Sequence, residues 1–302
     1  MDGYKKIIRN RKTREFILLF LRFIPDKWMI KLQYHIKTGR KLNLSNPQRY
    51  SEKMQWYKLN YKDPQMVQCT DKYEVRKYIR EKGYENLLNE CYGVYESFNE
   101  IQFDKLPNQF VLKDTLGSGG VSVIVVKDKK NVNFNDLRKQ VERWISTKCE
   151  KLDDGREWAY HAGKNHRIIV EKYIESMEGG GLTDYKFFCF NGEIACIYVI
   201  NNRVLGQHGQ LAIMDKDFNR LPVQSKTQET MKNNPKKPQN FEAMIEIAKK
   251  LSRDFPHVRV DLYNEEGKIL FGELTFYGAS GYILYDPDEF DYKLGEYFKL
   301  QV

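Results

Sequence analysis

The hydrophobic pattern along the chain predicts strands that come mostly in adjacent pairs. Alternating or continuous apolar runs predict strands over residues 109–113, 121–127, 167–174, 184–190 and 193–200. Two more strands are predicted over residues 258–263 and 269–276, joined by a turn that ends at Gly267. Asn191-Gly192 is a dipeptide typical of two-residue hairpin turns. Because hairpins outnumber βαβ units, the pattern predicts an α+β fold.

Helices are predicted where apolar residues recur at helical spacing beside capping residues. Asp71 and Glu74 form a capping-box pattern ahead of residues 73–80. Asn240 is predicted to cap a helix with a core-facing apolar stripe, formed by Phe241, Met244, Ile245, Ala248 and Leu251. Residues 222–240 hold three prolines among polar residues and are predicted to form a surface loop.

The positive charge of the chain is confined to residues 1–41. The 302 residues include 50 Lys and Arg against 41 Asp and Glu, which gives a formal net charge of +9. Residues 1–41 contain twelve Lys and Arg and three acidic residues, so they carry the whole excess and the remaining body is neutral. Nucleic-acid-binding proteins typically carry a basic face on the folded domain. We therefore expect a basic arm ahead of a neutral body, and no nucleic-acid partner.

Two apolar stretches lie within this basic segment. Residues 16–24 are apolar except at Arg22, but a bilayer span needs about 20 apolar residues, and no small-residue cleavage site follows. Residues 28–36 form a second, amphipathic stretch with lysines beside it. This pattern is typical of a helix at an anionic membrane surface, and also of a helix packed on the body with a solvated basic face. Residues 1–45 are thus predicted to form a basic amphipathic helical arm, with an anionic membrane surface as one candidate partner of residues 1–41.

The cysteines indicate a reducing cellular compartment, and the histidines give no sign of a metal site. The five cysteines are odd in number and form no Cys-x-x-Cys pair, so free thiols in a reducing cytoplasm are expected. The five histidines form no metal-ligand pattern. The predicted location is cytoplasmic, peripheral at the inner face of the cell membrane if the arm binds lipid.

The first candidate site is a glycine-rich loop between two predicted strands. Lys113 ends the incoming strand, and the loop contains Gly117, Ser118, Gly119 and Gly120. It is neither a Walker loop, since no Gly-Lys-Ser/Thr follows, nor a Rossmann turn, since a strand rather than a helix comes next. Backbone N–H groups at such a tip can approach phosphate oxygens, while the lysine supplies positive charge. An ordinary glycine-rich hairpin has the same pattern.

The second candidate site is the last predicted hairpin. Alternation places Arg259 and Asp261 on one face of its first strand, and Phe271, Glu273 and Thr275 on one face of its second. If the register brings the two carboxylates together, they offer oxygen ligands to Mg²⁺. The arginine beside them could stabilise phosphoryl or oxyanion charge. Charged residues on the solvent side of a half-exposed hairpin would give the same pattern.

Several strings of residues, taken in order, resemble the ATP-grasp superfamily and, more narrowly, its TupA-like branch of teichuronopeptide and capsule biosynthesis. The strings are residues 51–56, 71–73, 106–113, 170–174, 184–192, 258–263 and 271–276. The resemblance spans roughly residues 45–300 and implies an ATP-grasp fold, in which two antiparallel sheets clasp ATP. Behind the arm, it divides the chain into an N-terminal α/β subdomain (46–108), a lid subdomain with the glycine-rich loop (109–174) and a C-terminal subdomain with the metal site (175–302).

The resemblance also implies how ATP would be bound. Lys113 and the glycine-rich loop would contact its phosphates. The hinge beside the adenine would be formed by Glu171, Lys172, Tyr173 and Ile174. Asp184 would lie near the ribose, and Lys186 would face the phosphates.

Metal binding and catalysis are implied for a second group of residues. Asp261 and Glu273 would hold Mg²⁺, while Arg259 and Arg203 would stabilise an acyl-phosphate and a tetrahedral intermediate. The family's asparagine two residues after the metal-binding glutamate is Thr275 in this chain. A hydroxyl can still bind a metal, so the number of Mg²⁺ ions, one or two, stays open.

The implied activity is carboxylate activation by ATP, followed by attack of an amine to form an amide. The implied partners are ATP, a sugar-acid or polysaccharide carboxylate of capsule or teichuronopeptide type, and an amino-acid amine. Three alternatives remain open. An ATP-grasp kinase would phosphorylate a sugar, a glycosyltransferase of surface-polysaccharide synthesis could use the Asp-x-Asp triplets at residues 215–217 and 286–288, and a membrane-attached adaptor would use the hairpins as scaffold.

Overall fold

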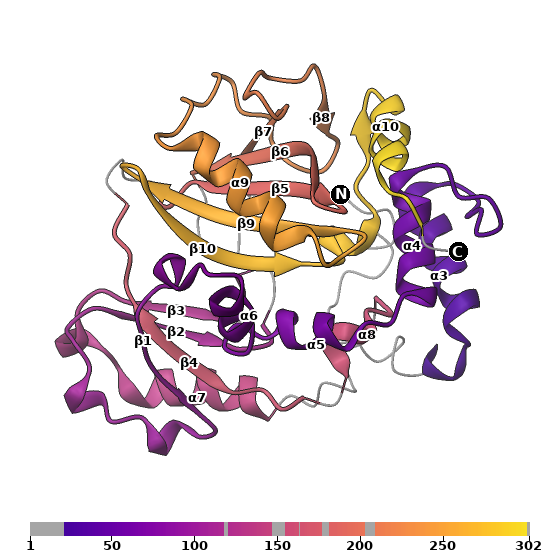
Figure 1. The fold of residues 1–302 in the computed structure, drawn as a ribbon. Coiled ribbons are helices and arrows are strands. Elements are labelled where there is room, and N and C mark those ends of the chain that lie inside the picture. Colours follow the sequence, from indigo (N-terminus) through magenta and orange to yellow (C-terminus); the bar gives the residue numbers. More distant parts are fainter. Residues whose placement is uncertain are drawn as a thin grey trace.

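The structure, a computed structural model, describes residues 21–117, 120–146, 155–162, 164–176, 181–202 and 209–300. Two antiparallel sheets organise the chain (Figure 1). The smaller sheet has the order β1 (Cys91–Tyr95), β4 (Ile168–Lys172), β2 (Phe110–Asp114) and β3 (Val123–Val126). The larger has the order β10 (Lys268–Thr275), β9 (Val258–Glu265), β5 (Asp184–Phe190), β6 (Glu193–Asn201) and β7 (Gln210–Met214). A third, small sheet pairs β11 (Tyr285–Asp286) with β8 (Gln224–Ser225).

The predicted α+β class with two antiparallel sheets is confirmed, since every strand pair in these sheets is antiparallel. All seven predicted strands form, within one or two residues of their predicted ends. Strand β1 was not predicted, because its five residues are uniformly half-buried and do not alternate. Strand β7 was also missed, and β8 lies within the segment predicted to be a loop.

The helices lie between and beside the sheets. The α-helices are α3 (Asp26–Thr38), α4 (Tyr50–Asn60), α5 (Pro64–Thr70), α6 (Val75–Glu81), α7 (Phe134–Ile145), α8 (Trp158–His161), α9 (Phe241–Ser252) and α10 (Glu289–Tyr297). Short 3₁₀ turns are η1 (Leu21–Phe23), η2 (Glu85–Leu87), η3 (Phe98–Glu100), η4 (Phe103–Lys105), η5 (Lys129–Asn131) and η7 (Gly278–Gly281). Among the helices of these described ranges, none is long and apolar enough to cross a membrane.

Two predicted helix caps differ in the structure. The Asp71 carboxylate accepts the backbone N–H of Tyr73 and Glu74, at 2.8 and 3.0 Å, but α6 begins only at Val75. The Glu74 carboxylate accepts from Arg167 at 2.7 Å, so no reciprocal capping box forms. Before α9, Asn240 adopts a φ of 59° and its side chain does not cap the helix.

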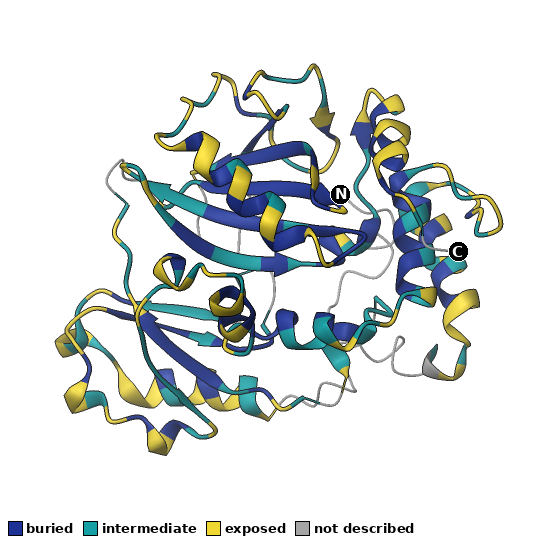
Figure 2. Cartoon of the chain, in the orientation of Figure 1, coloured by how far each residue is buried: buried dark blue, intermediate teal, exposed yellow. Residues whose placement is uncertain are grey.

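Each main sheet has its own hydrophobic core. Helix α9 packs its buried residues Phe241, Met244, Ala248 and Leu251 against the larger sheet, as its periodicity predicted, while Ile245 is only partly buried. Helix α7 buries Leu137 and Val141 against the smaller sheet. Figure 2 shows the strands mostly buried and the outer sides of both helices exposed. Each fully buried aliphatic side chain stabilises the fold by about 1.5–3 kcal/mol, so these two interfaces fix the sheets that carry the candidate sites.

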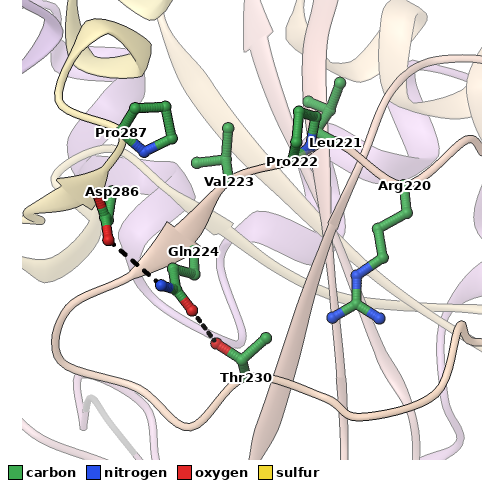
Figure 3. A pocket seen from close by; sticks show the side chains of 8 residues that line it. All are labelled: Arg220, Leu221, Pro222, Val223, Gln224, Thr230, Asp286 and Pro287. Atoms are coloured by element: carbon green, nitrogen blue, oxygen red, sulfur yellow. Dashed lines mark hydrogen bonds between the residues drawn. The ribbon is translucent and has the colours of Figure 1, made fainter.

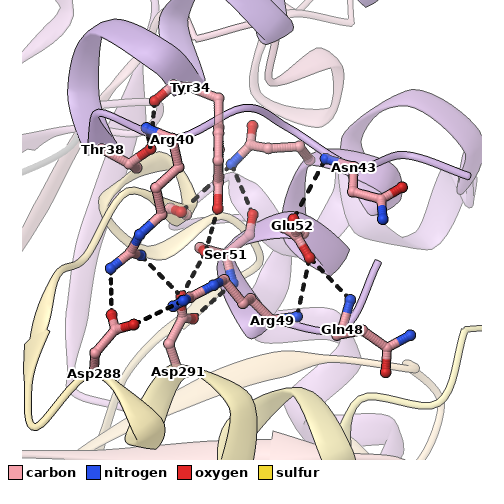
Figure 4. Close-up of polar contacts among 12 residues, drawn as sticks. Tyr34, Thr38, Arg40, Asn43, Gln48, Arg49, Ser51, Glu52, Asp288 and Asp291 are labelled. Atoms are coloured by element: carbon pink, nitrogen blue, oxygen red, sulfur yellow. Dashed lines mark hydrogen bonds and ion pairs between the residues drawn. The ribbon is translucent and has the colours of Figure 1, made fainter. Parts of the chain in front are cut away.

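The N-terminal helices are joined to α10 by a partly buried ionic cluster (Figure 4). Arg49 contacts Asp288 at 2.7 Å and Asp291 at 3.5 Å, and Arg40 pairs with both carboxylates. The Asp291 carboxylate also accepts the backbone N–H and the hydroxyl of Ser51, at 2.9 and 2.7 Å. Part of the predicted arm therefore belongs to the folded body, whereas residues 1–20 lie outside the described residues.

Candidate functional site

The register of three adjacent strands gathers charged residues on one face of the larger sheet. Asp261 on β9 lies directly opposite Lys186 on β5 and opposite Glu273 on β10. Arg259 lies opposite Thr275 two residues along the same hairpin. The sequence predicted a pair of carboxylates only if the register brought Asp261 and Glu273 together, and the register does so.

A β-bulge produces this register. Phe271 pairs with Leu262, but Glu273 pairs with Asp261, so Gly272 is the extra residue between them. The prediction that Phe271 and Glu273 share a face is wrong: Phe271 is buried in the core, and Glu273 faces Asp261. A Cβ added at Gly272 would lie 2.9 Å from the Asp261 carbonyl oxygen, so the close approach of the strands favours glycine.

Arg259 holds the two carboxylates together. Its guanidinium donates to both Asp261 oxygens at 2.7 Å and to Glu273 at 3.2 Å. Lys186 Nζ donates to Asp261 Oδ2 at 2.5 Å, and Asp184 Oδ1 lies 3.5 Å from the same Nζ. Asp261 is therefore a buried carboxylate with two cationic partners.

The charge states at this cluster follow from these contacts. Burial alone would raise the pKa of Asp261, but Arg259 and Lys186 favour the carboxylate more strongly and lower it. Burial disfavours the charged Arg259, yet Asp261 and Glu273 more than offset this effect and raise the arginine pKa. Asp261 and Arg259 therefore stabilise each other as a buried ion pair at neutral pH.

The chemistry of the carboxylate pair fits a magnesium ion. Both side chains supply oxygen ligands, and both already contact the same cationic group, so their oxygens converge on one position of positive charge. The Thr275 hydroxyl donates to Glu273 at 3.0 Å and accepts from Arg259 at 3.0 Å. Within the described parts of the chain, no three or more His, Cys, Asp or Glu side chains form a metal-binding group. The pair therefore suits Mg²⁺ that retains ligands from water and phosphate, rather than a cage built by protein alone.

The glycine-rich loop connects β2 and β3 in the smaller sheet. Gly117 N–H donates to the Asp114 carbonyl at 3.1 Å, and a Cβ at Gly117 would lie 2.7 Å from the Ser122 Cβ. Gly120 has a φ of 72°, which favours glycine. Ser118 and Gly119 lie outside the described residues. Glycine is thus favoured at position 117 because Ser122 lies too close for a Cβ, and at position 120 because the backbone has a positive φ.

A buried pair formed by the last residue of β2 and a residue just before β4 fixes the base of this loop. His166 Nδ1 lies 2.8 Å from both Asp114 carboxylate oxygens, and Asp114 Oδ1 also accepts the Leu116 N–H at 3.0 Å. Both side chains are almost fully buried. Neither residue was predicted to belong to the site, because the pairing depends on the β2–β4 register rather than on a local motif.

Lys113 and Glu171, both predicted site residues, form one ion pair. Lys113 Nζ lies 2.6 Å from Glu171 Oε2, and Arg76 on α6 lies 3.3 Å from Glu171 Oε1. Lys172 is exposed, and its carbonyl accepts from Asn89 at 2.8 Å. Tyr173 and Ile174 follow β4 and begin the connection from the smaller sheet to the larger one.

Lys72 is a cation that the sequence reasoning did not identify as a site residue. Its Nζ donates to the Gly117 carbonyl in the glycine-rich loop, and its backbone N–H donates to the Thr115 carbonyl at 2.9 Å. Burial lowers the pKa of Lys72, while the nearby carboxylates of Glu273 and Asp114 act in the opposite direction. Lys72 therefore lies between the glycine-rich loop of the smaller sheet and the Glu273 carboxylate of the larger one. Its one sequence signal is its place within the string 71–73.

The predicted site residues form two groups, and three of them cannot be placed. Asp184, Lys186, Arg259, Asp261, Glu273 and Thr275 gather on the larger sheet. Lys113, Gly117, Gly120 and Glu171 to Ile174 lie on the smaller sheet or at its end. Ser118, Gly119 and Arg203 lie outside the described residues.

Both Asp-x-Asp triplets are engaged in local structure. Asp215 accepts the N–H of Asp217 and Asn219, at 2.9 and 2.7 Å, and so closes a turn. Asp288 is paired with the arginines of the ionic cluster. Asp286 accepts from Gln224 at 3.3 Å and lines an open cavity of about 390 Å³ (Figure 3). The other lining residues are Arg220, Leu221, Pro222, Val223, Thr230 and Pro287, so the cavity shares no residue with the charged cluster.

Two antiparallel sheets, a glycine-rich loop after a lysine on one and a carboxylate pair on the other are the features of the ATP-grasp class. A family model described as TupA-like ATP-grasp matches residues 52–299. The chain therefore belongs to the TupA-like ATP-grasp family, and the resemblance inferred from the sequence is confirmed.

Solved structures of ligases are also similar to the chain. D-alanine–D-alanine ligase from Bacillus anthracis is 19% identical, with 69% of this chain and 57% of that chain covered and a TM-score of 0.42. L-amino acid ligase from Bacillus licheniformis is 15% identical, with 76% and 49% covered and a TM-score of 0.48. The chain thus spans about half the length of these proteins. A comparison with curated proteins finds no match.

Proposed function

We propose that the protein is an ATP-dependent carboxylate–amine ligase that forms an amide through an acyl-phosphate. The observation that carries the proposal is the convergence of Lys186, Arg259, Asp261 and Glu273 on one face of the larger sheet. Lys72 extends the positive charge to the glycine-rich loop of the other sheet. Alternating cations and carboxylates of this kind suit a nucleotide triphosphate with its metal ion.

The nucleotide would be bound between the two sheets. Lys72, Lys113 and Lys186 would neutralise phosphate oxygens, and backbone N–H groups of residues 117–120 would contact them from the loop side. The segment from Glu171 to Ile174 would form the hinge beside the adenine. Asp184, buried at the start of β5, would approach the ribose. The site thus provides cations for the triphosphate and a separate segment for the base.

Asp261 and Glu273 would hold Mg²⁺, which supplies positive charge against the phosphates as phosphoryl transfer proceeds. A substrate carboxylate oxygen would attack the terminal phosphorus, the bond to ADP would break, and an acyl-phosphate would form. An amine nitrogen would then attack the acyl carbon and lose a proton as phosphate leaves with the bonding pair. Arg259, already oriented by Asp261, would stabilise the oxyanion of this second step, with Arg203 as a second proposed donor.

We infer that the acceptor is a sugar-acid carboxylate of a capsule- or teichuronopeptide-type polysaccharide, or its precursor, and that an amino acid supplies the amine. Membership in the TupA-like family supports this substrate class. Lipid-linked precursors of such polymers would place the reaction in the cytoplasm, at the inner face of the membrane. A sugar kinase with the same nucleotide site is the second candidate, because the charged cluster would equally serve phosphoryl transfer to a hydroxyl.

The test is ADP release by the purified full-length protein with Mg²⁺ and ATP. We expect ADP, phosphate and an amide product by mass spectrometry when a uronic-acid oligosaccharide and an amino acid are both present. The variant Glu273→Gln should lose this activity, while Glu289→Gln, a change at an exposed glutamate on α10, should keep it. A phosphorylated sugar formed without any amine would contradict the ligase and support the kinase. Turnover of a nucleotide sugar without ATP would contradict both.

A further inference from the structure

Helix α3 presents a row of large apolar side chains to solvent. Trp28 is 64% exposed, Leu32 is 45% exposed and Ile36 is 46% exposed, and Phe23, just before the helix, is 77% exposed. Trp28, Leu32 and Ile36 are spaced four apart, so they form one continuous stripe, here called the outer row of α3. Exposed single apolar residues are common, but a contiguous row on one helix marks an interaction surface.

The opposite side of the same helix is fixed to the body. Ile30 and Tyr34 are fully buried and pack with Leu42. The Tyr34 hydroxyl lies 2.9 Å from the Ser51 hydroxyl, which in turn donates to Asp291. Because α3 is anchored on this side, the outer row is presented in a defined direction and is not a frayed end.

Positive charge surrounds the outer row. Lys27 is exposed, and Lys31 Nζ lies 5.2 Å from the centre of the Trp28 ring, so its aliphatic stem runs beside the row. Asp26 is the one acidic residue of α3, and it contacts Arg156 at 3.4 Å. Residues 1–41, which contain this helix, carry the whole +9 charge of the chain. The partner of the outer row is therefore expected to combine an apolar layer with negative charge.

The area of the row argues against a second copy of the chain as the partner. Four partly exposed apolar side chains offer roughly 500 Å² in total. A standard stable interface needs about 800 Å² from each partner. A bilayer interface has no such minimum, because a helix inserts its apolar side between headgroups while lysines contact anionic lipids.

We propose that the outer row of α3 inserts into the interfacial region of a membrane that contains anionic lipids, with Lys27 and Lys31 among the headgroups. This placement rests on the location given under the proposed function, but not on the ligase reaction. It assigns membrane contact to a defined face of one folded helix rather than to the basic segment as a whole.

The test is co-sedimentation of the full-length protein with vesicles of phosphatidylcholine, with or without phosphatidylglycerol. We expect stronger binding to the anionic vesicles, and about tenfold weaker binding for both Trp28→Gln and Leu32→Gln, since each removes one apolar side chain from the bilayer. Phe134→Gln on α7, at the far end of the molecule in Figure 1, is the matched control and should bind as the unaltered protein does. Trp28→Leu should still bind, but should lose quenching of tryptophan fluorescence by brominated acyl chains.

Unchanged binding of Leu32→Gln, or equal binding to both vesicle types, would overturn the proposal. So would a dimer that Leu32→Gln dissociates, because a second copy would then cover the row. A fall of several degrees in the melting temperature of Leu32→Gln would also overturn it, because residues 1–20 or another part of the chain would then cover the row. ADP release with soluble substrates should be the same in all these variants, so lipid binding and the ligase reaction can fail independently.

Discussion

Two conservative substitutions in the carboxylate pair should have equal effects on activity and very different effects on stability. Asp261 is 1% exposed and accepts charge-assisted bonds of 2.5–2.7 Å from Arg259 and Lys186. Asp261→Asn leaves these two cations without their buried counter-ion, and breaking such a pair costs about 3–5 kcal/mol. The Glu273 side chain is 45% exposed, so Glu273→Gln should cost no more than about 1 kcal/mol.

The assay measures the free energy of unfolding and metal binding separately. Urea unfolding without metal at neutral pH gives the two stability changes, with Glu289→Gln as the control. Calorimetric titration with Mg²⁺ in the presence of ADP should show binding for the unaltered protein and none for either variant. ADP release should fall by at least about a hundredfold in both, because each loses one of two protein ligands.

Two results would refute this reasoning. If Asp261→Asn destabilises the protein no more than Glu273→Gln does, the buried ion pairs of Asp261 do not form as described. If Glu273→Gln binds Mg²⁺ with ADP as the unaltered protein does, Glu273 is not a metal ligand.

Three further predictions concern other parts of the structure. Burial lowers the pKa of His257 to about 3, so the unfolded chain binds one more proton below the ordinary histidine pKa of 6.5. As the pH is lowered from 6.5 towards 3, the free energy of unfolding should therefore fall by up to about 1.4 kcal/mol for each pH unit. His257→Phe should reduce that slope in urea titrations, and an unchanged slope would contradict the burial effect. Gly117→Ala should raise KM for ATP, because the new Cβ would meet Ser122, and Ser122→Gly should restore part of the loss; equal KM values would contradict the close contact. Asp291→Ala, which removes a buried carboxylate, should lower stability by about 3 kcal/mol, and the partly exposed Asp288→Ala by about 1 kcal/mol. Thermal unfolding that ranks these two in the reverse order would contradict the larger contribution expected from the buried carboxylate.

The strands and hairpins could be predicted because their signals are local. Alternation of apolar residues and the Asn191-Gly192 turn lie within a few residues of the strands they define, and both residues of the turn adopt positive φ as a tight hairpin requires. Strand β1 carries no such signal, since its burial does not alternate. The local pattern therefore predicts the strands with a clear apolar run, and it misses β1, whose residues carry no alternation.

The residues of the charged site were partly predictable, but the contacts between them were not. Alternation alone placed Phe271 and Glu273 on one face, whereas the bulge at Gly272 turns only Glu273 towards Asp261. Lys72 has no periodic signal beyond its place in the string 71–73, and it reaches Gly117 because the segment between α5 and α6 lies against the glycine-rich loop. Bulges and contacts between distant segments depend on tertiary packing, so a single sequence does not reveal them.

The balance of charge at the cluster bears on how metal and nucleotide would bind. The three carboxylates of Asp184, Asp261 and Glu273 are matched by three cations: Arg259 and Lys186 contact them directly, and the charge of Lys72 acts on Glu273. A magnesium ion that entered alone would add two positive charges to a balanced, largely buried site and would compete with Arg259 for the same oxygens. Phosphate oxygens that arrive with the ion would instead offer new partners to Lys186 and Arg259 as they release the carboxylates. We therefore expect Mg²⁺ to bind together with the nucleotide, so that the calorimetric titration without ADP shows no binding even in the unaltered protein.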